Sequence, residues 1–166
     1  MITQQYLQDN FDYDPNTGLF VRTKKTSGTA KIGVPLTCDK GNGYIVFCVQ
    51  GKLQLAHRMA WLYVYGEIPS KNIDHINGIP SDNRISNLRL ANQSQNGANS
   101  NLSRSNKSGY KGVIWRKDVC KWEAQIGVNY KCVKLGRFDS KEDAAKAYAN
   151  AAQNYFGAFA NDGNLG

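Results

Sequence analysis

The segment IDHINGIPSDNRISNLR, residues 73–89, places an Asp-His pair at the end of a short apolar run. A polar loop follows, and Asn87 then opens a second apolar run. The chain has only two histidines, and one of them, His75, stands here beside a carboxylate just before a turn. Two interpretations are open. The pair forms either a hydrogen-bonded corner, in which Asp74 binds backbone amides, or a catalytic site.

Composition limits the classes of protein to consider. The length of 166 residues allows one medium domain or two small ones. The hydrophobic fraction of 41% is enough for a core. The chain has no long apolar stretch, and its first residues, MITQQYLQDNFDYD, lack the features of a secretory signal, so no membrane partner is expected. Its four cysteines are scattered, without a C-x-x-C pair: Cys38, Cys48, Cys120 and Cys132. We therefore expect free thiols in a reducing cytoplasm and no structural zinc.

Net charge indicates a polyanionic partner. The formal charge is +8 at pH 7, and the basic residues are unevenly distributed. Residues 107–134 hold a concentration of them: Lys107, Lys111, Arg116, Lys117, Lys121, Lys131 and Lys134. A solvated basic face is the plain alternative, but this concentration favours a nucleic acid.

The chain divides near residue 103, within a stretch rich in Asn, Ser and Gly. Before this stretch we predict strands over 18–22, 43–50 and 52–56, with Gly51 at a hairpin turn. An apolar helix over 57–67 follows, then two short strands around the polar loop and a polar helix capped at Asn92. The sequence thus predicts an α+β protein with domains at 1–103 and 104–166.

The second half has a different pattern. Three strand-like runs, SGYKGVIWR, KWEAQIGV and KCVKLGRF, are joined by short turns. An alanine-rich helix then begins after Ser140 and ends at Gly157. Its small and aromatic residues fall at helical spacing, so we expect it to pack on a small antiparallel sheet with Tyr148 and Tyr155 in the core.

The chemistry of the first segment favours catalysis over a corner. A strand–loop–strand–helix unit that folds tightly brings Asp74, His75 and one face of the helix together. Carboxylate and amide oxygens are hard ligands suited to Mg²⁺ or Mn²⁺. A neutral imidazole beside them can take a proton from water, because the histidine pKa lies near operating pH, and a metal can stabilise charge on a phosphate.

HRMAW, IDHINGIPSDNRISNLR and NQSQN together resemble the HNH endonucleases, in the DH…N…N form of the phage and intron-homing branch. The resemblance covers about residues 10–101 and implies a ββα-metal core at about 72–101. It implies that His75 is the general base and that Asp74 and Asn96 bind one divalent metal, Mg²⁺ or Mn²⁺. It implies that Asn87 holds the loop and orients the histidine. Asn92 or Asn99 remains an alternative to Asn96 as the ligand.

Other residues near these motifs take supporting positions. His57 opens the apolar helix, where capping or packing under the site is the expected role. The same resemblance gives His57 and Arg58 a supporting or phosphate-contacting role. Arg84 and Arg89 lie beside the metal motif, and we count both as DNA-binding candidates, with solvated surface charge as the alternative.

Residues 106–163 resemble the plant ethylene-response-factor type of DNA-binding domain through YKGV, KW, LGRFDSKEDAAKAY and FAN. The resemblance implies a three-stranded sheet that enters the major groove. Carried over by position, the DNA-contacting residues are Lys111, Arg116, Gln125 and Lys134. Trp115 is a further candidate for the DNA face. Ile114 and Gly127 stand where plant members often carry arginine, so plant-like sequence preference does not follow.

The sequence therefore predicts a hydrolase: a metal-dependent HNH endonuclease that nicks double-stranded DNA and is directed by its C-terminal module. We expect a phage or mobile-element origin and action in the cytoplasm of a bacterial host, with no obligate protein partner. The alternative is a sequence-specific DNA-binding protein with an inactive nuclease domain. A weaker alternative is a module that binds or cuts RNA.

Overall fold

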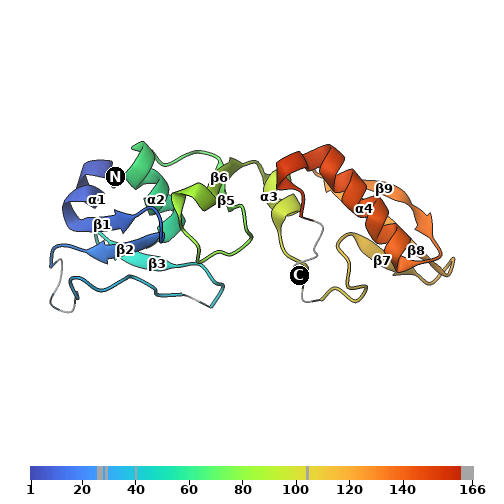
Figure 1. Ribbon diagram of the computed structural model, residues 1–166, viewed down its shortest axis with the longest axis horizontal. Helices are drawn as coiled ribbons and strands as arrows, with labels where there is room; N and C mark the ends of the chain where they lie inside the picture. The colour runs from blue at the N-terminus through green and yellow to red at the C-terminus, as the bar shows by residue number, and fades with distance from the viewer. Residues whose placement is uncertain (26–27, 29, 40, 104, 162–166) are drawn as a thin grey trace. The chain divides into compact units, whose positions relative to one another are not determined.

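The computed structural model describes residues 1–161 apart from 26, 27, 29, 40 and 104. The chain forms two compact units, residues 1–90 and 91–166, and each is described by itself. Helices and small sheets alternate through both (Figure 1), which confirms the mixed α and β class. The division along the chain falls about a dozen residues before the boundary predicted at 103, because the helix after β6 packs with the second unit. Residues 104 and 162–166, where the predicted C-terminal domain begins and ends, lie outside the described residues.

The first unit opens with a short helix and two hairpins. Helix α1 (Gln4–Asn10) is capped by the Thr3 side chain, which accepts a hydrogen bond from the Tyr6 amide. Strands β1 (Phe11–Asp14) and β2 (Leu19–Arg22) pair antiparallel. So do β3 (Val46–Val49) and β4 (Lys52–Leu55), and the turn between them has positive φ at Gln50 and Gly51, as predicted for Gly51.

Helix α2 (Ala56–Tyr65) follows β4 directly and ends at Gly66, which adopts the left-handed conformation. Its buried face joins an aromatic core made by both hairpins. The core residues include Leu7, Phe11, Phe20, Phe47, Met59 and Leu62. Ile73 and Leu88 belong to the same cluster, so the core fixes the two strands that carry the predicted site.

These two strands are β5 (Asn72–His75) and β6 (Leu88–Ala91), and they form a two-stranded sheet. A 3₁₀ turn, η1 (Ile85–Asn87), immediately precedes β6. Helix α3 (Gln93–Asn99) then begins in the second unit with a capping box. In this box the Asn92 side chain accepts from the Gln95 amide, and the Gln95 side chain accepts from the Asn92 amide.

The second unit contains an antiparallel sheet of β7 (Val113–Arg116), β8 (Lys121–Val128) and β9 (Lys131–Phe138), in that order. Helix α4 (Lys141–Phe156) begins after the Ser140 cap, ends at Gly157 as predicted, and leads into the 3₁₀ turn η2 (Gly157–Phe159). Its buried residues pack on the sheet, namely Ala144, Tyr148, Ala151 and Ala152. The core position predicted for Tyr155 is wrong: the residue is 51% exposed.

Two further findings bear on the composition. All four cysteines are unpaired and exposed. Across the described part of the chain, no helix is both long and apolar enough to cross a bilayer.

Candidate active site and nucleic-acid interface

The Asp-His pair lies at the end of β5, where both side chains are buried. Two main-chain hydrogen bonds fix the turn that follows. The Gly78 amide donates to the His75 carbonyl over 2.9 Å, and the Ile76 amide donates to the Asn87 carbonyl over 2.8 Å. The end of β5 is thus tied to η1 as well as to β6.

Asn87 closes the polar loop with its side-chain amide. Its Oδ1 accepts from the Asn77 amide over 3.0 Å, and its Nδ2 donates to Asn77 Oδ1 over 3.0 Å and to the Asp82 carbonyl over 2.9 Å. Asn87 is itself buried, so these bonds satisfy a polar group that has left water. These bonds link Asn87 to two residues of the loop, and its role toward the histidine stays a prediction.

The asparagine that faces the histidine ring is Asn83, which the sequence analysis did not select. Its Oδ1 lies 3.4 Å from His75 Nε2, and its Nδ2 donates to the Ser81 carbonyl over 3.1 Å. The Asn83 carbonyl accepts a 2.7 Å hydrogen bond from the buried Tyr13 hydroxyl. Asn83 is thus anchored to the aromatic core from one side and presents its amide to His75 from the other.

Three rings pack edge to face around the site. The centroid of the His57 ring lies 5.2 Å from that of His75, and Tyr44 lies 5.5 Å from His57 and 5.8 Å from His75. His57 is 6% exposed, and within the described part of the chain its Nδ1 has no hydrogen-bond partner. The ring therefore packs against that of His75, and its supporting role stays a prediction.

Burial sets the protonation of both histidines. Desolvation lowers the pKa of His57 to about 3, with smaller contributions from His75 and Arg58. Desolvation also lowers the pKa of His75, although Asn83, Asp74 and Asp82 act in the opposite direction. Both rings are therefore neutral at pH 7, and a neutral imidazole can accept a proton.

Asp74 and Arg89 form an ion pair. Arg89 Nε donates to Asp74 Oδ2 over 2.8 Å, and both side chains are largely buried. Arg89 was selected as a DNA-binding candidate, and the structure places its guanidinium on the predicted metal-binding carboxylate. The sequence did not indicate this contact, because the two residues are 15 positions apart and come together only through the pairing of β5 and β6.

The other two arginines near the motif differ in exposure. Arg84 is exposed and forms a two-pronged pair with Asp82, at 2.8 and 2.6 Å. Arg58 is half-buried on α2 and donates to the Pro69 carbonyl over 3.4 Å. The guanidinium of Arg84 is thus the more accessible of the two to a phosphate.

The predicted metal ligand Asn96 is half-buried on α3, within the second unit. Its two alternatives lie at the ends of the same helix. The Asn92 side chain caps the helix, so its oxygen is already used. Asn99 is buried, and its carbonyl accepts from the Asn161 side chain over 3.0 Å.

The predicted DNA contacts of the second unit divide between the two faces of the sheet. Arg116, Gln125 and Lys134 lie on the face away from α4, and Gln125 pairs with Lys134 across β8 and β9. Trp115 lies on the other face: it follows Val113 by two residues and stacks on its cross-strand partner Trp122, 5.1 Å away. The pleat therefore separates Trp115 from the other predicted contacts.

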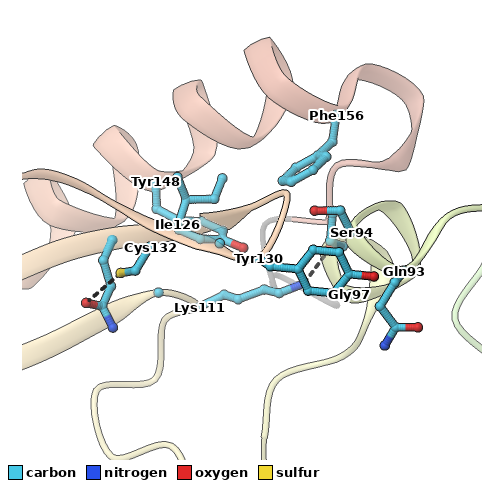
Figure 2. A pocket seen from close by; sticks show the side chains of 13 residues that line it. Gln93, Ser94, Gly97, Lys111, Ile126, Tyr130, Cys132, Tyr148 and Phe156 are labelled. Carbon is cyan, nitrogen blue, oxygen red and sulfur yellow. Dashed lines mark hydrogen bonds between the residues drawn. The ribbon is translucent and has the colours of Figure 1, made fainter.

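Lys111 is engaged inside the unit. Its ammonium donates to the carbonyls of Ala98 and Ser100 at the end of α3. Figure 2 shows the side chain extending toward α3 along a cavity of about 500 Å³, which Tyr130 and Tyr148 also line. A cation at the end of a helix satisfies carbonyls that have no partner within the helix. This position gives Lys111 a structural contact in addition to the DNA contact predicted for it.

Comparisons with known proteins associate a family with this geometry. The family model described as HNH endonuclease matches residues 54–98, from β4 to α3. An uncharacterised HNH endonuclease of Acanthamoeba polyphaga mimivirus is 34% identical over 120 residues, which is 72% of this chain and 62% of that protein. Protein 3.8 of Escherichia phage T7 is 38% identical over 71 residues, which is 42% of this chain and 59% of that protein.

The matched segments thus span about three fifths of these relatives. No solved structure matches the chain. The chain carries an HNH endonuclease domain with viral homologues, so this part of the predicted resemblance is confirmed. The matched segment contains Asp74, His75, Asn83, Asn87 and Asn96.

Proposed function

We propose that this chain is a metal-dependent DNA endonuclease in which His75 takes a proton from the attacking water. The observation that carries the proposal is a buried, neutral histidine at the end of β5, beside a buried carboxylate, inside the segment that matches the HNH endonuclease family. A general base must be neutral at operating pH, and burial keeps His75 neutral.

The hydrogen bonds around His75 assign its two nitrogens. Asn83 Nδ2 donates to the Ser81 carbonyl, so Oδ1 of Asn83 is the atom that faces the ring. His75 Nε2 then carries the proton and Nδ1 holds the lone pair. In this proposal the neutral ring accepts the proton of water as water attacks the scissile phosphorus.

Asp74 and Asn96 would hold the divalent ion, as the family resemblance implies. Among the described residues, no cluster of three or more His, Cys, Asp or Glu side chains is placed to bind a metal. The donors available at the motif, a carboxylate and an amide, are hard oxygen ligands, and Mg²⁺ commonly uses only one or two carboxylates together with water and substrate phosphate. The chemistry supplied by such an ion is stabilisation of charge on the scissile phosphate.

The second unit would bind double-stranded DNA through the sheet face that carries Arg116, Gln125 and Lys134. Basic residues are concentrated in this part of the sequence, and a sheet fits the major groove of B-form DNA better than the narrow groove of A-form RNA. The resemblance to the ethylene-response-factor type of domain supports the same assignment. The viral homologues support a phage or mobile-element origin. Membership of the homing branch rests only on the resemblance of the DH…N…N motif.

One observation favours the alternative, a DNA-binding protein with an inactive nuclease domain. Arg89 already neutralises Asp74 through a 2.8 Å ion pair. A metal ion would have to bind beside this guanidinium or displace it. The two functions predict different outcomes when DNA, metal and protein are combined.

The test is cleavage of supercoiled plasmid by the full chain in Mg²⁺, in Mn²⁺ and in EDTA. We expect nicked circles before linear DNA, because one site per chain cuts one strand at a time, and ends with a 3′-hydroxyl and a 5′-phosphate. EDTA should stop cleavage without preventing binding, and Asp74→Asn should cut far more slowly than the wild type. Binding without cleavage in either metal would establish the alternative, and preferential cleavage of RNA would replace DNA as the substrate.

A further inference from the structure

The sheet of the second unit has one face that α4 does not cover, which we call the open face. Val113, Ala124 and Ile126 point toward α4 and are buried. The residues that alternate with them or pair across the strands lie on the opposite side. The open face comprises Ile114, Arg116, Lys121, Glu123, Gln125, Cys132, Lys134 and Arg137.

Glu123 is an unusual member of this face because it is only 1% exposed. Its two oxygens are matched by two arginines from the neighbouring strands. Arg137 Nε on β9 lies 3.1 Å from Oε2, and Arg116 Nη1 on β7 lies 3.9 Å from Oε1. A carboxylate removed from water requires such partners, since an unpaired buried charge is strongly unfavourable.

Both arginines remain partly open to solvent. The Arg116 side chain is 37% exposed and that of Arg137 is 44% exposed. Arg116 is also held from outside by Asp118, whose Oδ1 accepts from Nε over 3.2 Å. Each guanidinium is therefore tethered on one side while part of its surface faces outward.

We propose that Glu123 is a positioning residue that holds Arg116 and Arg137 on the open face, and that Arg137 reads bases beside Arg116. The proposal rests on the DNA-binding part of the proposed function. A guanidinium has five N–H donors, so one bound to a carboxylate keeps others for the acceptor pair of guanine in the major groove. An arginine already held in place loses less side-chain entropy on binding than a free one.

Glu123 also limits binding that is independent of sequence. Its negative charge subtracts from the positive field that attracts any phosphate backbone. A device that orients two arginines while weakening general attraction increases the difference between preferred and other sequences. If Glu123 is a positioning residue, removing its charge should weaken sequence preference without weakening general binding. If its role is merely structural, both should weaken together.

The test is selection by the full chain, in EDTA, from a pool of DNA duplexes with a randomised centre. Binding of the enriched duplex is then compared with binding of the unselected pool. We expect Glu123→Gln to bind the unselected pool at least as tightly as the wild type, while its preference for the enriched duplex falls about tenfold or more. Arg137→Lys keeps its charge, so it should bind the pool as before and lose discrimination at one or two base positions.

Glu142→Gln is the matched control for Glu123→Gln, because it also removes one negative charge, from an exposed position on α4. It should keep the preference of the wild type. Unchanged preference in both Glu123→Gln and Arg137→Lys would overturn the proposal. So would equal weakening toward both DNAs with a lower unfolding midpoint, which is the result of a structural role. A wild type that enriches no sequence would also overturn it, whereas the nuclease proposal is decided separately by plasmid cleavage.

Discussion

The two units bury polar groups in different ways. In the first, the buried polar side chains gather at β5 and its loop or beneath them: His57, Asp74, His75, Asn83 and Asn87. In the second, the buried carboxylate of Glu123 lies among arginines that stay partly exposed. The first arrangement takes two histidines and an ion-paired carboxylate out of water, and burial keeps both histidines neutral, so an imidazole there can accept a proton. The second leaves positive charge accessible, as binding to a polyanion requires.

This difference predicts how substitutions in each unit should behave. Changes at the first cluster should alter rate or stability and leave the salt dependence of DNA binding alone. Changes on the open face should alter salt dependence or sequence preference and leave the fold nearly as stable. Each prediction below can sharpen this division or break it.

The largest effect is expected for His75→Ala. Loss of a general base typically lowers a rate by about 10²–10⁴-fold. Because the ring is 5% exposed, DNA affinity in EDTA should stay close to that of the wild type. The measurement is the initial rate of plasmid nicking in Mg²⁺.

Stability must be checked in the same variant, because removing a buried ring also removes packing. Urea unfolding establishes that the variant is folded at the assay temperature, and duplex binding in EDTA establishes that the second unit is intact. If folded His75→Ala nicks plasmid as fast as the wild type, the assignment of the base is wrong.

The next effect is on stability, through Asn87→Ala. The variant leaves the Asn77 amide and the Asp82 carbonyl without the partners they have now. Leaving buried or part-buried polar groups without hydrogen-bond partners should lower the free energy of unfolding by about 2–4 kcal/mol in total. The measurement is the free energy of unfolding in urea.

Asn42→Ala provides the control for that substitution. Asn42 is exposed, and its Oδ1 accepts from the Tyr44 amide over 3.2 Å. Its loss should cost under about 1 kcal/mol. If the two variants lost equal free energy of unfolding, the hydrogen bonds that Asn87 makes to the polar loop would stabilise the first unit no more than those of an exposed turn.

A smaller effect is the dependence of stability on pH that His57 contributes. Burial lowers its pKa to about 3 in the folded chain, whereas histidine in the unfolded chain titrates near 6.5. Between these values the unfolded state binds more protons, so the contribution is complete above about pH 6.5 and is lost as pH falls toward 3. The loss approaches about 1.4 kcal/mol per pH unit.

Comparing wild type with His57→Phe isolates this contribution, because phenylalanine keeps a ring and cannot titrate. Between about pH 6.5 and pH 5.5 the free energy of unfolding of the wild type should fall by more than that of His57→Phe. His75 also has a lowered pKa, so the variant should keep part of the slope. Parallel pH profiles for the two proteins would mean that His57 is not held neutral by burial.

Local signals predicted most of the fold. Gly51 lies in the turn between β3 and β4, Gly66 and Gly157 end α2 and α4, and the Ser140 side chain caps α4. These features depend on residues close in sequence, so the sequence reveals them. Tyr155 shares the helical spacing of Tyr148 but lies in the last turn of α4 and is exposed. Periodicity identifies a face of a helix but not how far along that face the sheet extends.

The site was predictable where a motif carried it and not where tertiary contacts did. Asn83 stands in the quoted motif, yet its role depends on the hydroxyl of Tyr13, 70 residues earlier in sequence. Tyr44 gave no local signal at all for its place beside both histidines. Trp115 was grouped with the basic residues because the strand phase of β7 relative to α4 is set by Val113 packing, which the pattern alone left open.

The smallest expected effect on DNA binding distinguishes two lysines that the sequence analysis treated alike. Lys134 is exposed on the open face opposite Gln125, whereas the Lys111 ammonium binds the carbonyls of Ala98 and Ser100. Each phosphate contact contributes about 0.9 to the slope of log affinity against log salt, so Lys134→Ala should lower that slope by about 1. Lys111→Ala should leave the slope unchanged and instead destabilise the second unit by about 1.5–3 kcal/mol, because it removes charged hydrogen bonds.

The measurements are duplex affinity at several salt concentrations in EDTA and urea unfolding of the same proteins. A reduced slope for Lys111→Ala with unchanged stability would place that lysine on DNA. If Lys134→Ala bound like the wild type at every salt concentration, the open face would be a solvated surface, and the division between a buried catalytic cluster and an exposed binding face would fail.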